Sequence, residues 1–189
     1  CIRDSNNTAV GSASMNSNTG DGNVAVGKES LSMNTGDENT ALGLFALSNN
    51  LGGDNNTAVG NESLQGNDSG NKNTAIGHNS GTNNASGSYM TFLGTDANCS
   101  SGALQYSTAL GYGSEVSASN QIMVGRASET TVIPGDVSFN KTLSIGQGIT
   151  INGSAVVPFT TPASSTATGT KGQIAVDANY IYVCVATNT

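Results

Sequence analysis

Only a few side chains in this sequence have types and spacings that could perform chemistry. His78 is the only histidine, and the three cysteines, Cys1, Cys99 and Cys184, stand far apart. A catalytic triad, a zinc site or a general base needs more partners than these residues provide. We therefore interpret His78 as an exposed or turn residue and the cysteines as isolated reduced thiols.

The acidic residues offer another route to catalysis, because glycoside cleavage needs two carboxyl groups about 5–10 Å apart beside a sugar-sized groove. Glu29 and Glu62 occupy equivalent positions, each two residues after a recurring glycine, but in repeats that are not adjacent. Adjacent repeats lack such a pair, and aromatic stacking residues are few. The chain is therefore expected to be no enzyme and to need no cofactor.

Acidic turns could also hold calcium. The stretches NTGDGN, NTGDEN and GGDNN are rich in oxygen ligands, but the tandem Gly-Gly-x-Gly-x-Asp nonapeptides of calcium-binding β-rolls are missing. Asp21, Asp37 and Asp54 are better explained as turn residues that bond to the backbone. No metal site is predicted, and these three residues are the only candidates for one.

The composition narrows the class of partner. The 189 residues include six Lys or Arg and 13 Asp or Glu, which leaves a formal net charge of −7. Phosphate contacts require clustered basic residues, so neither nucleic acid nor an anionic membrane surface is expected as a partner. No apolar run approaches the ~18 residues of a transmembrane helix.

A repeated sequence motif defines the elements that must position these residues. NNTAVG occurs at 6–11 and again at 55–60, and NVAVG, NTALG and NTAIG are variants of it. Its glycine recurs at spacings of 16, 16, 17, 17, 17, 17 and 14 residues, at Gly11, Gly27, Gly43, Gly60, Gly77, Gly94, Gly111 and Gly125. A period this short predicts a solenoid, and the recurring glycines and the missing helical periodicity argue against helices.

Each repeat is predicted to form one rung of an all-β solenoid with coils of 16–17 residues. The motif is expected to form a short strand, and a second strand is expected around ESL at 29–31 and 62–64. Turns rich in Gly, Asn and Asp are expected to close the coil. Rungs about 4.8 Å apart place equivalent residues over one another. Hydrogen bonds along the axis are then expected between stacked asparagines, in a structural ladder of Asn7, Asn23, Asn39, Asn56 and Asn73.

The alternation of side chains along the strand predicts two unlike faces. The residues three and one before the glycine share a bulky face of Thr, Val, Leu and Ile, whereas Ala and Gly share a nearly bare face. Because so thin a coil buries little apolar surface alone, lateral association of identical rods is expected. The bare face is expected to allow close backbone approach, and Ala41→Gln is predicted to block assembly.

Several stretches resemble known repeats. NTALGLFALSNN at 39–50, NNTAVGNESL at 55–64 and NTAIGHNSG at 73–81 resemble the head repeats of trimeric autotransporter adhesins, and more closely the related repeats of phage and large-virus fibre proteins. Residues 117–139 and 169–189 resemble segments of viral fibre and phage tail-fibre proteins. The resemblance implies a homotrimer of left-handed parallel β-rolls that serves adhesion or forms a shaft.

The chain is predicted to contain four segments, of which the repeat occupies residues 1–128. Residues 129–160 are expected to form a β-rich shaft or neck, with strands at TTVI, DVSF, TLSIG and ITING, the last leading into a hairpin. A linker rich in Ser, Thr, Ala and Gly follows at 161–172, and a small β-hairpin is expected at 173–189.

The repeated motif is interrupted between residues 82 and 112, where aromatic side chains replace the usual residues. Function often resides where a regular scaffold is interrupted, so this stretch is the candidate receptor contact. The interpretation preferred over a receptor contact is that its aromatic residues plug or widen the core of the trimer. The residues concerned are Tyr89, Phe92, Tyr106 and Tyr112.

These features predict a non-enzymatic, homotrimeric fibre or spike subunit on the surface of a virion, such as a phage tail fibre whose rigid shaft supports host attachment. Its expected partners are further copies of the chain, other virion structural proteins, and a host surface receptor or glycan. One alternative is the passenger domain of a trimeric adhesin on a bacterial cell surface. Another is a polysaccharide-cleaving tailspike.

Overall fold

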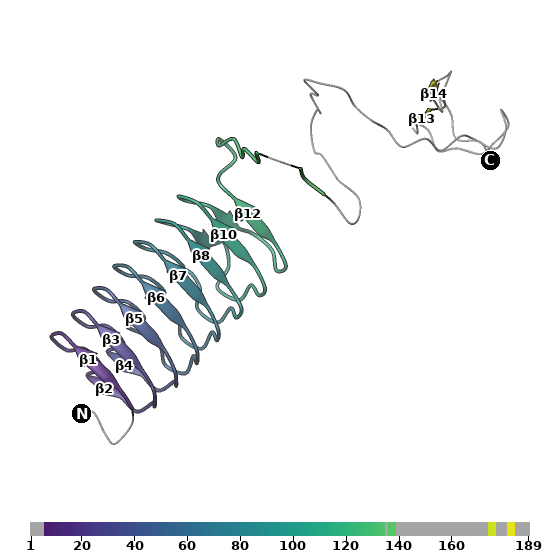
Figure 1. The fold of residues 1–189 in the computed structure, drawn as a ribbon. Helices are drawn as coiled ribbons and strands as arrows, with labels where there is room; N and C mark the ends of the chain where they lie inside the picture. The colour runs from purple at the N-terminus through teal and green to yellow at the C-terminus, as the bar shows by residue number, and fades with distance from the viewer. Residues whose placement is uncertain (1–5, 135, 139–173, 177–180, 184–189) are drawn as a thin grey trace. The chain divides into compact units, whose positions relative to one another are not determined.

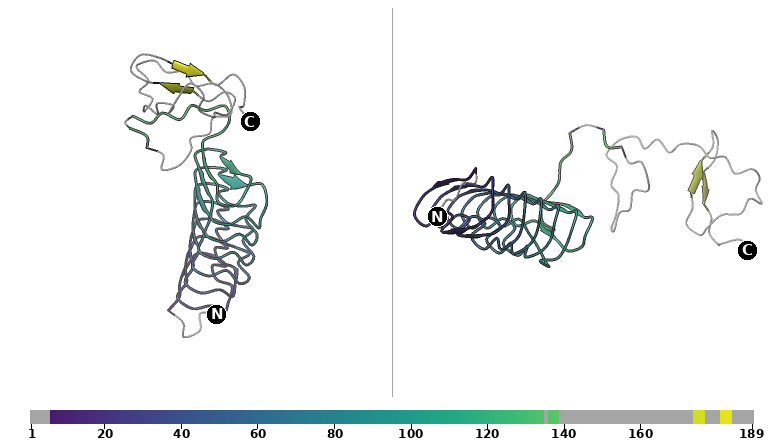
Figure 2. Two further views of the ribbon diagram at one scale, coloured as in Figure 1. Left: turned by 90° about the vertical axis from the view of Figure 1, so that its right-hand side faces the viewer. Right: turned by 90° about the horizontal axis from the view of Figure 1, so that it is seen from below.

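In a computed structural model, the chain divides into two compact units, residues 1–135 and 136–189. The first unit is a stack of similar coils (Figure 1), which Figure 2 shows from two further sides. No helix occurs in the part of the chain that the structure describes, and therefore none that could span a membrane. The structure describes residues 6–134, 136–138, 174–176 and 181–183.

A parallel eight-stranded sheet forms one side of every coil, here named the strand side. Its strands, in spatial order, are β1 (Thr8–Val10), β3 (Val24–Val26), β5 (Thr40–Leu42), β6 (Thr57–Val59), β7 (Thr74–Ile76), β8 (Thr91–Leu93), β10 (Thr108–Leu110) and β12 (Ile122–Val124). Equivalent residues pair, for example Ala41 with Ala58 and Leu42 with Val59. The predicted parallel β-solenoid and its register are therefore confirmed.

The other side of the coil, here named the return side, differs from the prediction. The segments at 29–31 and 62–64 are turns, so the strand predicted around ESL is wrong. Glu29 and Leu31 have φ angles of 55° and 46°, and two left-handed residues so close together bend the chain too sharply for a strand. The return side of the described coils has strands only at β2 (Ser17–Asn18), β4 (Met33–Asn34), β9 (Asn98–Cys99) and β11 (Glu115–Val116).

Two columns of apolar side chains fill the interior of the solenoid. The strand side contributes fully buried alanines at Ala25, Ala41, Ala58, Ala75 and Ala109. The turn into the return side contributes Met15, Leu31, Leu47 and Leu64. A small residue in one column leaves the space that a large residue of the other column needs, which is how so narrow a coil reaches the packing density of a protein core.

The bare face therefore lies inside each coil and the bulky face lies outside. Ala41 has no exposed surface, whereas the neighbouring Leu42 is 47% exposed. A glutamine at this position would overfill the coil itself, so the predicted loss of assembly in Ala41→Gln would come from damage to the fold and not from a blocked contact between rods. The apolar surface available for lateral association is the bulky one.

The recurring glycine is required by the stacking of the rungs. Gly60 has a φ angle of 137°, and a Cβ atom at this residue would lie 2.4 Å from the carbonyl oxygen of Gly77. Glycine alone adopts this backbone conformation at little cost and tolerates so close a neighbour. The glycine column therefore sets how closely the backbones of successive coils approach.

The coil lengthens from 16 to 17 residues without disturbing the stack. Asn34 is bonded to Asn50, 16 positions along the chain, whereas Gly36 faces Gly53, 17 positions along. The extra residue is therefore accommodated between Asn50 and Gly53. A Cβ atom at Gly52 would meet nothing within 4 Å, so this residue lies outside the packed part of the coil.

The second unit contains one described pair of strands. β13 (Ile174–Val176) pairs antiparallel with β14 (Ile181–Val183), within the segment interpreted as a hairpin. Residues 130–133, predicted as the strand TTVI, and 136–138 have no regular secondary structure, so the first of these predictions is wrong. Among the described residues, β12 is the last strand of the solenoid sheet, so TTVI has no partner strand there. Phe139 of DVSF, the strands predicted at TLSIG and ITING, and the linker at 161–172 lie outside the described residues.

Candidate functional site

The residues with catalytic chemistry are not gathered into one site. His78 is exposed on a turn, and Glu29 and Glu62 belong to coils that are not adjacent. Cys99 is buried in the core. Burial, and then the charge of Glu115, raises the pKa of the Cys99 thiol to about 11. A thiol that stays protonated at neutral pH is a poor nucleophile.

The three candidate calcium ligands bond to the backbone of neighbouring turns. Asp21 Oδ1 accepts hydrogen bonds from the N–H groups of Asn6 and Gly22, both at 2.9 Å. Asp37 Oδ1 accepts the N–H of Asp21 at 2.7 Å, and Asp54 Oδ1 accepts the N–H of Asp37 at 2.8 Å. Across residues 6–134, no three or more His, Cys, Asp and Glu side chains are grouped to hold a metal ion. These aspartates tie successive coils together.

The asparagines of the repeated motif stack over one another, and their side chains form hydrogen bonds with the backbone. Each Oδ1 accepts the N–H of the next residue in the column, as Asn39 Oδ1 does from Asn56 at 2.8 Å. Each Nδ2 donates to the carbonyl of a turn glycine, as Asn39 Nδ2 does to Gly53 at 2.8 Å. The column contains Asn7, Asn23, Asn39, Asn56 and Asn73 and ends at the N–H of Met90. These bonds satisfy buried amide groups and align the rungs.

A second column of asparagines forms the amide-to-amide ladder that was expected for the first. Asn34 Nδ2 donates to Asn18 Oδ1 at 2.6 Å, and Asn50 Nδ2 donates to Asn34 Oδ1 at 2.6 Å. Sequence reasoning missed this column, although its members all stand seven residues after a recurring glycine. The column consists of Asn18, Asn34, Asn50, Asn67 and Asn84.

The outer surface of the strand side carries an exposed apolar column, here named the outer apolar strip. It consists of the residue before each recurring glycine. The exposed fractions of its most exposed members lie between 38% at Leu110 and 56% at Val10. These members are Val10, Leu42, Ile76, Leu93, Leu110 and Val124. A continuous apolar stripe of this kind marks a surface for contact with another molecule.

The aromatic residues of the interrupted repeat have different environments. Tyr89 and Tyr106 are exposed and stacked, with ring centroids 4.9 Å apart, and Lys72 Nζ lies 5.4 Å from the centre of the Tyr89 ring. Tyr112 is also exposed and lies 4.7 Å from the guanidinium of Arg126. Both contacts are within cation–π range.

Phe92 is fully buried inside its coil, which corrects its assignment as a receptor contact. It occupies the position of the buried alanines, and Gly81 occupies the position of the buried leucines. A Cβ atom at Gly81 would lie 2.7 Å from Phe92 Cδ2 and 2.9 Å from Leu64 Cδ2. The ring therefore fills the space that a leucine fills elsewhere, and it fills the core of the coil itself.

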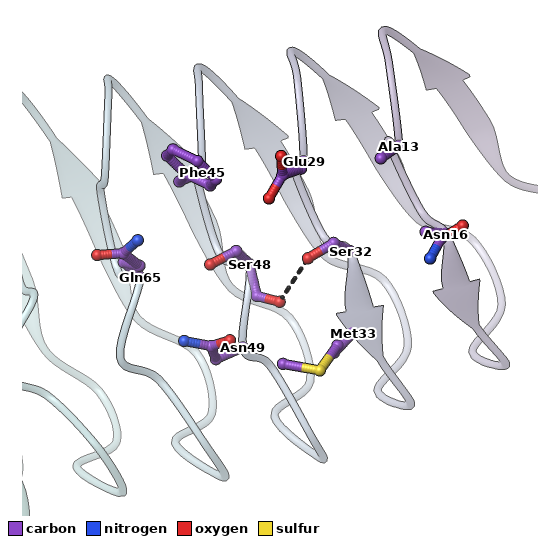
Figure 3. A pocket seen from close by; sticks show the side chains of 9 residues that line it. All are labelled: Ala13, Asn16, Glu29, Ser32, Met33, Phe45, Ser48, Asn49 and Gln65. Carbon is purple, nitrogen blue, oxygen red and sulfur yellow. Dashed lines mark hydrogen bonds between the residues drawn. The ribbon is translucent and has the colours of Figure 1, made fainter.

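A groove of about 480 Å³ crosses several coils near the N-terminal end of the solenoid (Figure 3). One wall is the row of turn residues Ala13, Glu29 and Phe45, and the other contains Met33 and Asn49. Ser32 and Ser48 lie between the walls, and Asn16 and Gln65 lie at the two ends of their row. The sequence signal for the groove is two successive serines in a column that otherwise holds larger side chains.

Comparison with known proteins identifies the fold. No protein-family model matches the sequence, and no curated protein does. The crystal structure of the collagen-binding domain of the Yersinia adhesin YadA is similar, with a TM-score of 0.51 and 22% sequence identity. The match covers 72% of this chain and 68% of that domain. At this identity the likeness shows the fold alone, which is an all-β parallel β-solenoid.

Proposed function

We propose that this chain is the head of a homotrimeric attachment fibre displayed on a cell surface, with a role in adhesion. The outer apolar strip is the observation that carries the proposal. Leu42, Ile76 and Leu93 are each more than two-fifths exposed, and they line up along the sheet. Closed packing of identical rods around an axis would bury this strip on every subunit at once.

The similar fold supports an adhesin more than a virion fibre. The matching YadA domain is the collagen-binding part of an adhesin. We extend this to a host surface molecule such as collagen as the partner of the present chain. The exposed Tyr89, Tyr106 and Tyr112 are the proposed receptor contacts, because aromatic side chains supply much of the energy of protein interfaces.

A virion fibre is the second candidate, favoured by a specific observation. Residues 117–139 and 169–189 resemble segments of viral fibre and phage tail-fibre proteins. The same trimeric rod would then act as a stiff shaft that holds an adjoining module away from the particle.

Light scattering of the purified full chain tests the assembly, with a mass of three chains as the expected result. The double variant Leu42→Glu/Ile76→Glu places charges in the strip and is expected to yield monomers, because unpaired charges are costly to bury. Leu51→Glu is the matched control, since Leu51 is 51% exposed but belongs to the return side. A wild-type chain that is monomeric at every concentration, or a control that dissociates equally, contradicts the proposal.

A further inference from the structure

The groove in Figure 3 is hollow because of two small residues. Ser32 and Ser48 stand five residues after their recurring glycines, where the coils on either side carry Asn16 and Gln65. Two short side chains between two long ones leave an elongated depression along the axis of the solenoid. Its volume of about 480 Å³ is within the usual size range of small-molecule sites.

The lining offers hydrogen-bonding groups that the protein does not use itself. Within residues 6–134, the side-chain amides of Asn16, Asn49 and Gln65 make no hydrogen bond, nor does the hydroxyl of Ser48. The buried side chain of Asn50 is hydrogen-bonded by contrast. An amide presents both donors and an acceptor, which is the combination that a ring of sugar hydroxyls requires.

The lining also offers an apolar platform. Phe45 and Met33 face the groove from opposite walls, and Met33 is 46% exposed. Phe45 has a φ angle of 56°, and Lys28 Nζ lies 5.9 Å from the centre of its ring. An aromatic ring beside free amides suits a ligand with an apolar C–H face and a polar rim, as a pyranose ring has.

The charge of the groove selects among ligands with this chemistry. Glu29 is the only charged residue in the lining, and its carboxylate is 3.3 Å from Lys28 Nζ. The pair leaves no net charge at the groove. A neutral groove offers no net electrostatic attraction to an anionic sugar or a basic peptide. An uncharged ligand needs no such attraction and is therefore the better match.

We propose that this groove binds a neutral oligosaccharide, so that the solenoid recognises a glycan through the side of one chain. The proposal rests on the proposed function as an attachment fibre, for which it names a ligand class. Every residue of the groove comes from one chain and none from the outer apolar strip, so recognition does not depend on the number of chains that assemble.

Isothermal titration of the full chain tests the proposal with defined probes. The neutral probes are chitotriose, maltotriose and lacto-N-tetraose, the anionic probes are 3′-sialyllactose and a heparin tetrasaccharide, and a (Pro-Pro-Gly)-repeat peptide represents an extended protein ligand. The expected result is saturable binding of at least one neutral oligosaccharide. Ser32→Gln fills the hollow with the residue that the same column carries at Gln65, and it is expected to weaken binding by about tenfold or more.

Phe45→Ala removes the platform and is expected to weaken binding by a similar factor, so the test does not depend on one variant. Glu62→Ala changes the same turn position on the next coil, where Gln65 lines the groove but Glu62 does not, and it is expected to bind within about twofold of the wild type. Circular dichroism melts confirm that each variant is folded. No binding of a neutral probe, binding of only an anionic or peptide probe, or full binding by Ser32→Gln would overturn the proposal. Light scattering of the same samples distinguishes this failure from failure of assembly.

Discussion

The regular coils at 23–77 and the interrupted stretch at 81–112 solve the same packing problem with different residues. In the regular coils, a buried alanine on the strand side accompanies a buried leucine on the return side. In the interrupted coils, Phe92 takes the alanine position and Gly81 the leucine position. The comparison teaches that the solenoid conserves the total volume inside its coils and not the residue at each position.

The largest loss of stability is expected when the leucine of the regular coils is introduced into the interrupted stretch. Gly81→Leu restores the leucine of the other coils, but its side chain would overlap Phe92 and Leu64. We expect a loss of about 3 kcal/mol or more in the free energy of unfolding, measured by chemical denaturation.

Phe92→Ala alone is expected to cost a similar amount, about 3–5 kcal/mol, because it leaves a cavity beside Gly81. The double variant Gly81→Leu/Phe92→Ala recreates the regular pair and should recover most of the lost stability. If the two losses simply add, volume compensation does not explain the interrupted coil.

The recurring glycine is a feature that both regions share, so its replacement should affect them equally. Gly60→Ala and Gly94→Ala would each place a Cβ atom 2.4 Å and 2.6 Å, respectively, from a carbonyl of the next coil, at φ angles of 137° and 138°. We expect each to cost about 2–3 kcal/mol in thermal or chemical unfolding. Gly52→Ala is the control, with an expected change within about 0.5 kcal/mol. A tolerant Gly94 would show that the interrupted coils stack more loosely.

The second asparagine column separates the two regions again. Asn50 donates to Asn34 and accepts from Asn67, whereas the Oδ1 of Asn84 has no hydrogen-bond partner in the part of the chain that the structure describes. Asn50→Ala is expected to cost about 2 kcal/mol, and Asn84→Ala about 1 kcal/mol, in the same denaturation assay. Equal losses would show that position along the column does not matter.

The smallest expected effect concerns pH and is confined to the interrupted coils. Burial raises the pKa of the Cys99 thiol from its ordinary value of 9.0 to about 11, so the unfolded chain loses this proton before the folded chain does. The stability that the protonated Cys99 thiol contributes is therefore fully present below pH 9, and it is lost as the pH rises from 9 to 11. Thermal melts at pH 8 and 10.5 should show a drop that is smaller in Cys99→Ala. An equal drop in both proteins would assign the effect to other groups.

The sequence predicts the stacked sheet well because its cause is periodic. Equal spacing of the Asn, Ala, Val and Gly columns determines which strands pair and in which register. Alternation distinguishes two faces, but it does not say which face is inside, so the expectation that the alanine face lies between rods is wrong. The inside is defined by Leu31, Leu47 and Leu64, which are buried with the alanines in one core.

Other features escaped prediction because they depend on conformation or on distant partners. Glu29 and Leu31 are ordinary strand or helix residues by composition, and nothing in their types indicates left-handed backbone angles. The burial of Phe92 does not follow from its own position in the sequence, because it depends on the missing side chain of Gly81 in the preceding coil. The groove likewise depends on Ser32 and Ser48 being adjacent in space, although they are 16 residues apart in sequence.

The turn between Asn50 and Gly53 is a place where the chain can grow, because a Cβ atom at Gly52 would meet nothing within 4 Å and, among the described residues, the one backbone contact of Gly52 is the hydrogen bond that its N–H donates to the carbonyl of Asp68. Both flanking residues are held by the asparagine columns, so added residues would extend outward while the rungs keep their register. Rod length, which depends on the number of coils, and loop content, which depends on this turn, are thus independent variables. A peptide grafted between Leu51 and Gly53 would be displayed at a fixed height along the rod.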